Sequence, residues 1–166
     1  MRILGIDPGY DRLGIAVIEK PAEGNAGAKD VLLYSSCFQT SAKDPIYERL
    51  LAIGEEIGRI LDEFEPEIVA LETLFVTKNQ KTAMRVAEAR GIIIYEASKR
   101  GLEIREYGPM EIKTAITGNG RSDKVMMTKM VKILIDMPTD KGGKKALDDE
   151  FDAIAVAIAC SAMRGR

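Results

Sequence analysis

Histidine is absent from this chain of 166 residues. Its absence excludes Ser-His and Cys-His nucleophilic catalysis, zinc sites that use imidazole, and the most common general base. Any acid–base or metal chemistry must therefore rest on carboxylates, lysine or tyrosine. Sites built from carboxylates alone suit hard cations such as Mg²⁺ and Mn²⁺.

Cysteines and long apolar runs are also scarce. The two cysteines, Cys37 and Cys160, lie far apart among apolar neighbours, a pattern that favours reduced, buried thiols. No apolar stretch approaches the roughly 18 residues that a membrane span needs. The opening MRILGID is not typical of a signal peptide, because its apolar run is short and an acid follows at once. We therefore expect a cytoplasmic protein that does not associate with membranes.

The net charge of −2 and the pI near 5.4 do not indicate a protein that binds nucleic acid. The distribution of charge is more informative. Residues 78–132 hold 12 Lys/Arg against 6 Asp/Glu, which gives this stretch +6 and leaves −8 for the remainder. A basic central third can be a binding surface or only a solvated one. The length and the ordinary hydrophobic content predict one domain over residues 1–166.

The apolar pattern alternates between strand and helix periods along the chain. Strands are predicted at Arg2–Asp7, Arg12–Glu19, Asp30–Gln39, Glu67–Glu72 and Leu102–Tyr107. Helices are predicted at Pro45–Phe64, Thr77–Arg100, Pro109–Thr117, Ser122–Met137 and Asp149–Met163.

Three meandering strands followed by βαβ units indicate an α/β fold, with one five-stranded mixed sheet and helices on both faces. Right-handed crossovers can place strand Glu67–Glu72 beside strand Arg2–Asp7 and parallel to it. Asp7 and Glu72 would then both lie at strand carboxyl ends, where α/β sheets place their ligands.

Each acid in this region has an ordinary structural explanation. Asp7 precedes Pro8 and Gly9 and can be a turn residue, while Glu72 can be a solvated strand end. Asp149 and Asp152 resemble a helix-capping pair. Taken singly, each acid is better explained in this way.

Taken together, the acids favour a metal site. Asp152 has Asp149 three residues before it and Asp148 four residues before it, so helical geometry gathers all three on one face and turns Glu150 elsewhere. Acids that converge with Asp7 cannot all ionise without cations to offset their repulsion. Two divalent ions in such a site suit in-line phosphodiester displacement. The spacing alone does not choose between Asp148 and Asp149.

Six motifs in register resemble the RuvC family of Holliday-junction resolvases (crossover junction endodeoxyribonucleases) over nearly the whole chain. They are GIDPG at 5–9, LE with F-x-x-K-N at 71–79, AxxxxxARG at 83–91, Y-x-P-x-x-I-K at 107–113, GNGRSDK at 118–124 and D-x-x-D-A-x-A at 149–155. The resemblance implies an RNase H-like fold and endonucleolytic cleavage of four-way junctions in DNA recombination and repair. Paired symmetric nicks would leave 5′-phosphate and 3′-hydroxyl ends.

The resemblance assigns the catalytic and metal-binding acids to Asp7, Glu72, Asp149 and Asp152, which makes Asp148 the expected N-cap. In some family members histidine replaces the acid at the position of Asp149. The implied cofactor is Mg²⁺, two ions per site, with Mn²⁺ as a substitute.

The same motifs imply nucleic-acid contacts by a scattered set of residues. The junction wedge falls on Phe75, which can instead be a core or staple residue for the following helix. Tyr107 is expected to pack in the core. The backbone-contacting lysines correspond to Lys113 and Lys124, both inside the basic stretch. The full predicted set is Phe75, Lys78, Asn79, Lys113, Arg121 and Lys124.

The resemblance also implies a homodimer, whose two-fold axis matches a junction with two equivalent strands to cut. Ala83, Ala87 and Gly91 form a stripe of small residues at i, i+4 and i+8 on the long helix, so this face is the predicted dimer contact. The alternative is packing of the stripe against the sheet. RuvA and RuvB, the branch-migration proteins of the family, are the other expected partners.

Three alternative functions are open at this stage. An actin-like phosphotransferase would use GIDPG as a phosphate loop, but it needs a second domain for which the chain has no room. An RNase H-like nuclease acting on RNA–DNA hybrids would use the same acids. A non-catalytic junction-binding protein would need no complete set of acids, and this chain has one.

Overall fold

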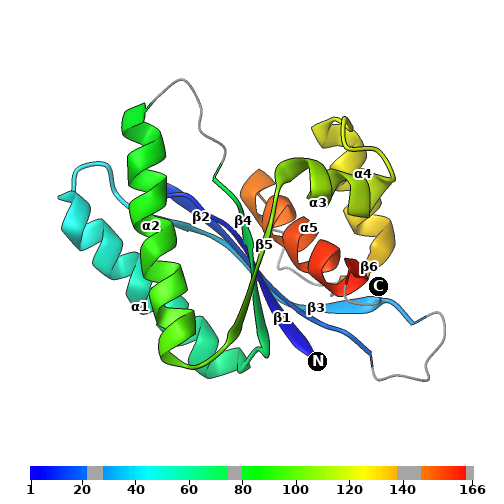
Figure 1. The fold of residues 1–166 in the computed structure, drawn as a ribbon, viewed down its shortest axis with the longest axis horizontal. Helices are drawn as coiled ribbons and strands as arrows, with labels where there is room; N and C mark the ends of the chain where they lie inside the picture. Colours follow the sequence, from blue (N-terminus) through cyan, green and yellow to red (C-terminus); the bar gives the residue numbers. More distant parts are fainter. Residues whose placement is uncertain (22–27, 75–79, 138–146, 164–166) are drawn as a thin grey trace.

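A six-stranded sheet forms the centre of the molecule in the computed structural model, which describes residues 1–21, 28–74, 80–137 and 147–163 (Figure 1). The strands are β1 (Arg2–Asp7), β2 (Arg12–Glu19), β3 (Asp30–Gln39), β4 (Ile68–Glu72), β5 (Glu103–Tyr107) and β6 (Ile135–Asp136). The helices are α1 (Ile46–Phe64), α2 (Gln80–Lys99), α3 (Pro109–Thr117), α4 (Lys124–Leu134) and α5 (Asp148–Met163).

The order of the strands is β5-β4-β1-β2-β3-β6. β1, β2 and β3 form the antiparallel meander, and β4 runs parallel to β1, as predicted. β5 extends the sheet parallel to β4. The carboxyl ends of β1, β4 and β5 therefore meet at the same edge, and two of them end in the acids Asp7 and Glu72.

The sheet has six strands rather than the predicted five. The predicted helix Ser122–Met137 is too long at both ends, because α4 begins at Lys124 and ends at Leu134. The Asp123 carboxylate caps the start by accepting a hydrogen bond from the Met126 amide at 2.8 Å. Beyond Leu134 the backbone turns extended and β6 pairs in parallel with the start of β3. Burial of Ile135 against the sheet outweighs the helical pattern there.

Helices cover both faces of the sheet, as predicted, with α1 and α2 on one side and α3, α4 and α5 on the other (Figure 1). Successive residues of each strand point to opposite faces of the sheet and so pack against the two helical layers in turn. Leu4 and Ile6 of β1 pack with the α1–α2 layer, whereas Ile3 packs with α5. Because both faces are covered, β1 and β4 read as continuous apolar runs.

Two glycines allow α5 to lie directly on the central strands. A methyl group at Gly5 would overlap the Ala153 carbonyl oxygen, and one at Gly14 would overlap the Asp149 carbonyl oxygen. Ala157 also lies against Gly5. The close approach brings the first two turns of α5, which carry Asp149 and Asp152, up to the end of β1.

No helix in the ranges that the structure describes is both long and apolar enough to cross a membrane.

Candidate active site

A cavity of about 330 Å³ opens at the carboxyl ends of β1 and β4. Asp7, Glu72 and Asp152 line it together with the lysines Lys113 and Lys124. Its apolar wall is formed by Pro109, Ile112, Met127 and Ala155. A second cavity of about 220 Å³ on the other side of Asp7 and Glu72 extends to α2. Three of the four predicted acids therefore share one cleft.

Asp7 and Glu72 form the floor of this cleft, at the ends of the adjacent parallel strands β1 and β4. Burial, and then the neighbouring carboxylates of Glu72, Asp152 and Asp149, raise the pKa of Asp7 from 3.8 to about 8. Burial also raises the pKa of Glu72. With a pKa of about 8, Asp7 is mostly protonated at neutral pH.

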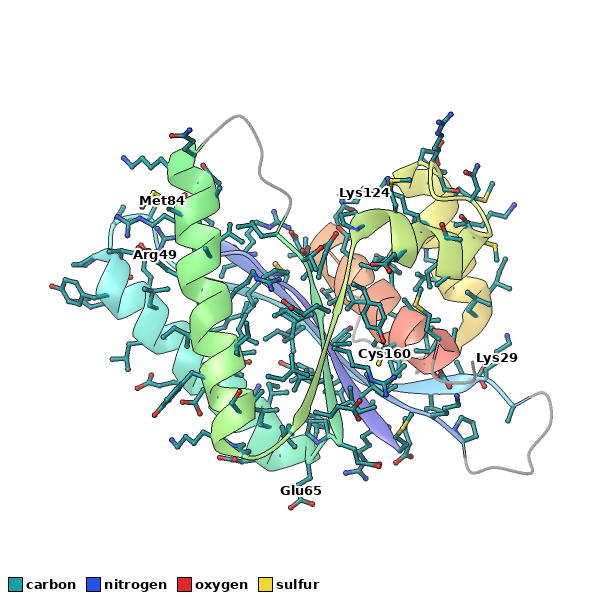
Figure 2. All side chains as sticks on the ribbon, in the orientation of Figure 1. Lys29, Arg49, Glu65, Met84, Lys124 and Cys160 are labelled. Carbon is teal, nitrogen blue, oxygen red and sulfur yellow. The ribbon has the colours of Figure 1, made fainter. Side chains whose placement is uncertain are left out.

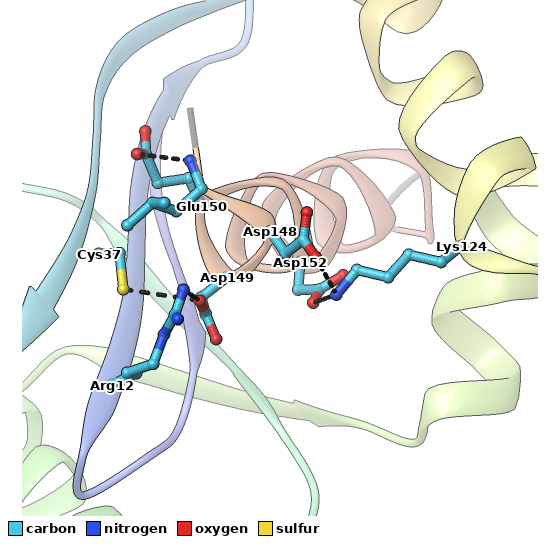
Figure 3. A network of polar contacts seen from close by, with 8 residues as sticks. Arg12, Cys37, Lys124, Asp148, Asp149, Glu150 and Asp152 are labelled. Atoms are coloured by element: carbon cyan, nitrogen blue, oxygen red, sulfur yellow. Dashed lines mark hydrogen bonds and ion pairs between the residues drawn. The ribbon is translucent and has the colours of Figure 1, made fainter. Parts of the chain in front are cut away.

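Asp152 faces the same cleft from α5. Its carboxylate Oδ2 lies 3.2 Å from the Lys124 Nζ, which also lies 3.4 Å from Oδ2 of Asp148 (Figure 3). Burial raises the pKa of Asp152, and the Lys124 ammonium opposes that rise. Lys124 extends from the start of α4 toward the strand ends (Figure 2).

Asp149 lies on the β2 side of the cluster and is not among the residues that line the two cavities. Its Oδ2 forms an ion pair with Arg12 and accepts a hydrogen bond from the Cys37 thiol at 3.6 Å (Figure 3). It is nevertheless close enough to contribute to the raised pKa of Asp7. Burial, followed by the charge of Asp149, raises the pKa of Cys37, so this thiol remains protonated.

The start of α5 differs from the prediction in one respect. Asp148 is the first helical residue and not the N-cap. Glu150 reaches back to accept a hydrogen bond from the Leu147 amide at 3.1 Å, which places Leu147 at the cap. Glu150 also accepts a hydrogen bond from the Ser35 hydroxyl at 2.9 Å. Glu150 therefore faces β3 and points away from the cleft, as helical geometry predicts.

The predicted nucleic-acid contacts fall into two groups. Lys113 and Lys124 line the cleft, and Arg121 is exposed in the turn between α3 and α4. Its amide donates a hydrogen bond of 3.0 Å to the Asn119 side chain. Phe75, Lys78 and Asn79 lie outside the described residues. Tyr107 is buried in the core, as expected.

Three residues around the acids were not predicted from the sequence. Arg12 and Cys37 contact Asp149, as described above. Arg90 of α2 donates a hydrogen bond to the backbone carbonyl of Glu72 and forms an ion pair with Glu106. Arg90 belongs to the AxxxxxARG motif, which marked it as notable without indicating its partner. No local signal pointed to Cys37.

The donor set fits a divalent cation by its chemistry, since hard cations prefer carboxylate oxygens. Mutual repulsion contributes to the raised pKa of Asp7, and a bound cation would offset it. Within the described ranges, no three acidic or cysteine side chains are arranged to hold a metal ion as they stand. In this arrangement Lys124 pairs with Asp152 and Arg12 pairs with Asp149.

A mixed sheet of this topology, with an acidic cleft at the ends of β1 and β4, defines an α/β protein of the RNase H-like class. A model of one family within this class, described as crossover junction endodeoxyribonuclease RuvC, matches residues 3–160. The chain belongs to the RuvC family, whose nucleases depend on divalent metal ions.

Individual members show how far the similarity extends. The crossover junction endodeoxyribonuclease RuvC of Thermosipho melanesiensis is 43% identical over 157 residues, which cover 95% of this chain and 94% of that protein. The structure of Thermus thermophilus RuvC superposes with a TM-score of 0.84 at 30% identity, over 99% of this chain and 96% of that one. The same Thermus protein in complex with a Holliday junction substrate gives a TM-score of 0.86, over 99% of this chain and 94% of that one.

Proposed function

We propose that this protein is an endonuclease that resolves four-way DNA junctions in recombination and repair by hydrolysing phosphodiester bonds. The observation that carries the proposal is the single cleft in which Asp7, Glu72 and Asp152 face Lys113 and Lys124. Acids of this kind bind the catalytic cations, and the lysines attract the phosphate backbone. Membership of the RuvC family supports the four-way junction as the substrate. The proposed site of action is the cytoplasm.

Asp7, Glu72, Asp149 and Asp152 would hold two divalent cations, Mg²⁺ or Mn²⁺ in its place. When bound, such ions activate the attacking water and stabilise charge on the leaving oxygen. Asp7, whose pKa is raised, would have to be ionised to hold a cation, because a protonated carboxyl is a poor ligand for a hard cation. Lys124 would leave Asp152 at the same step and become available to a DNA phosphate.

The basic residues around the cleft would position the scissile strand. Lys113 and Lys124 lie closest to the acids, and Arg121 extends the basic surface beyond them. Phe75, Lys78 and Asn79 remain proposed junction contacts on the strength of the sequence motif. Each nick would leave a 5′-phosphate and a 3′-hydroxyl, so the products remain ligatable.

Symmetric cleavage requires two active sites, and we propose that a homodimer provides them through α2. Ala87 and Gly91 are exposed, and a methyl group at Gly91 would meet nothing within 4 Å. The buried residues of α2 are Ala89, Ile93 and Ala97, so another face of α2 packs on the sheet. Ala83 is half-buried and lines the smaller cavity beside Asp7 and Glu72, so the proposed contact rests on Ala87 and Gly91.

The exposed apolar surface continues along α2 beyond the small residues. Met84 and Tyr95 are 66% and 61% exposed, and Met84 points away from the sheet (Figure 2). A groove between α1 and α2, of about 620 Å³, is lined in part by Tyr47, Leu51 and Tyr95. An exposed apolar face of this extent is typical of a protein contact. RuvA and RuvB are proposed as further partners.

A cleavage assay on three substrates tests the proposed function. A synthetic four-way junction, a duplex of matched sequence and an RNA–DNA hybrid are each incubated with Mg²⁺, beside Ca²⁺ as a binding control. We expect paired nicks in the junction with Mg²⁺ alone. Preferential cleavage of the hybrid would favour an RNase H activity, and junction binding without cleavage under any metal would favour a non-catalytic role.

A further inference from the structure

The first turn of α5 rests on a small platform of β2 and β3. Gly14 pairs with Cys37 across the two strands, and Arg12 lies two residues before Gly14, so all three face the same side of the sheet. The Asp149 carbonyl lies where a side chain at Gly14 would be. Arg12 and Cys37 therefore lie next to the backbone of Asp149, within reach of its carboxylate.

Both neighbours bind the same oxygen of Asp149. The Arg12 Nη2 forms an ion pair with Oδ2, and the Cys37 Sγ donates to Oδ2 at 3.6 Å (Figure 3). Within the part of the chain that the structure describes, no hydrogen bond or ion pair involves Oδ1. Two donors on one oxygen fix the orientation of a carboxylate and leave the other oxygen available.

The turn that leads into β2 and Arg12 is held by Arg49. Arg49, whose side chain is 8% exposed, donates to the Tyr10 carbonyl at 3.0 Å and forms an ion pair with Asp11. It also donates to the Thr40 hydroxyl at 2.8 Å. These contacts fix the turn that joins the end of β1 to Arg12. The guanidinium therefore approaches Asp149 from a backbone that is firmly placed.

Stability alone does not account for the Arg12–Asp149 pair. The side chain of Arg12 is 47% exposed, and an ion pair that is exposed to this extent contributes little to stability. The pair adds little to the free energy of folding, but it is directed at one oxygen of a proposed metal ligand. Its role is therefore better sought in the orientation of that ligand. Metal-binding carboxylates are commonly oriented by such hydrogen bonds, and their loss typically costs about 10- to 100-fold in metal affinity.

We propose that Arg12 is a positioning residue for Asp149: it holds Oδ2 together with Cys37, so that Oδ1 is presented to the cation. This inference rests on the proposed function, in which Asp149 is a metal ligand. Arg12 does not touch the reacting atoms in this scheme and acts only through Asp149. It remains on Oδ2 when the cation binds, unlike Lys124, which must leave Asp152.

Calorimetric titration of the DNA-free protein with Mn²⁺ tests the assignment without relying on cleavage. We expect Arg12→Ala to weaken Mn²⁺ binding about 10- to 100-fold. Arg12→Lys, which keeps one donor, should fall between Arg12→Ala and the wild type. Arg59→Ala is the matched control, because Arg59 is also 47% exposed and forms ion pairs with Glu56 and Glu63 on α1, remote from the cleft. Its Mn²⁺ affinity should equal that of the wild type.

Two further measurements separate the possible failures. Asp149→Asn should weaken Mn²⁺ binding, and if it does not, the proposed function fails in its choice of ligand. If Asp149→Asn weakens binding but Arg12→Ala leaves it unchanged or tightens it, only the role of Arg12 is overturned. Junction affinity in Ca²⁺ should be unaltered by Arg12→Ala while kcat falls; loss of junction affinity at unchanged Mn²⁺ affinity would make Arg12 a DNA contact instead.

Discussion

Asp7 and Glu72 end neighbouring parallel strands and lie together at the floor of the cleft. Burial and the neighbouring carboxylates favour a protonated Asp7 at neutral pH, and a bound cation would take the place of that proton. The pair therefore combines a catalytic requirement with a cost in stability. The first two predictions separate these two consequences.

Replacing Asp7 by Asn should abolish cleavage while leaving junction binding intact. The amide keeps the size of the side chain and its place at the end of β1, but it cannot supply an anionic ligand. We expect cleavage to fall roughly 10³-fold or more, the scale seen when an essential catalytic group is removed. Junction binding in Ca²⁺ and cleavage in Mg²⁺ are measured side by side, with Asp44→Asn, at an exposed position, as the control. Normal cleavage by Asp7→Asn would refute the proposed site.

The same substitution should change how stability depends on pH. The pKa of Asp7 is about 8 in the folded protein and ordinarily 3.8, so between these values only the folded state keeps the proton. By linkage, stability falls as the pH rises through this window. In EDTA, the melting temperature of the wild type should drop between pH 5 and pH 8.5 by several degrees more than that of Asp7→Asn, since each 1 kcal/mol corresponds to roughly 2–4 °C in a chain of this size. Parallel melting curves for the two proteins would contradict the raised pKa.

Arg90 should matter to both stability and activity, because it joins α2 to the end of β4 through the carbonyl of Glu72. Its side chain is 12% exposed and also pairs with Glu106. We expect Arg90→Met to lower the free energy of unfolding by about 1–3 kcal/mol, measured by urea denaturation, and to reduce cleavage. Arg85→Met is the control on the same helix, since Arg85 pairs with Glu88 near the surface. The control should stay within roughly 0.5 kcal/mol of the wild type.

Gly91→Leu should separate dimer formation from folding. A side chain at this position meets open space within the chain, so the fold should tolerate it. Removing a glycine from the interior of a helix even favours the helix by roughly 0.5–1 kcal/mol. On the proposed dimer face, however, a leucine would hold two α2 helices apart. Sedimentation at micromolar concentration should show a dimer for the wild type and for Lys129→Leu on α4, and a monomer for Gly91→Leu. A dimer that survives Gly91→Leu would place the interface elsewhere.

The sequence predicted the sheet well where each strand is encoded by its own residues. The bounds of β1, β2 and β3 were predicted correctly, because apolar runs there are bounded by clear turn residues. α3 was also predicted correctly, since Pro109 begins it and Gly118, in the left-handed conformation, ends it. β6 was missed because its two residues become a strand only by pairing with the start of β3.

The same distinction applies to the cleft. Strand ends and helical periodicity indicated Asp7, Glu72 and the face of α5, and three of the four acids do share a cavity. The side chains that pair with those acids could not be predicted from a local sequence pattern. Arg12 lies 137 positions before Asp149 in the chain, and Cys37 lies 112 positions before it. Only the packing of α5 on Gly14 brings these residues together.

That packing has a consequence for how the site tolerates change. At Gly5 and Gly14 the backbone of α5 lies directly against the backbone of the strands. The distance between α5 and the sheet is therefore set by contacts between main-chain atoms. Elsewhere in a protein, the distance between a helix and a sheet follows the volume of the side chains between them. Here the core around α5 can exchange one apolar residue for another of different size without carrying Asp149 and Asp152 away from Asp7. Substitutions in the core therefore leave the positions of the acids unchanged. Those positions depend instead on Gly5 and Gly14, which must stay without a side chain.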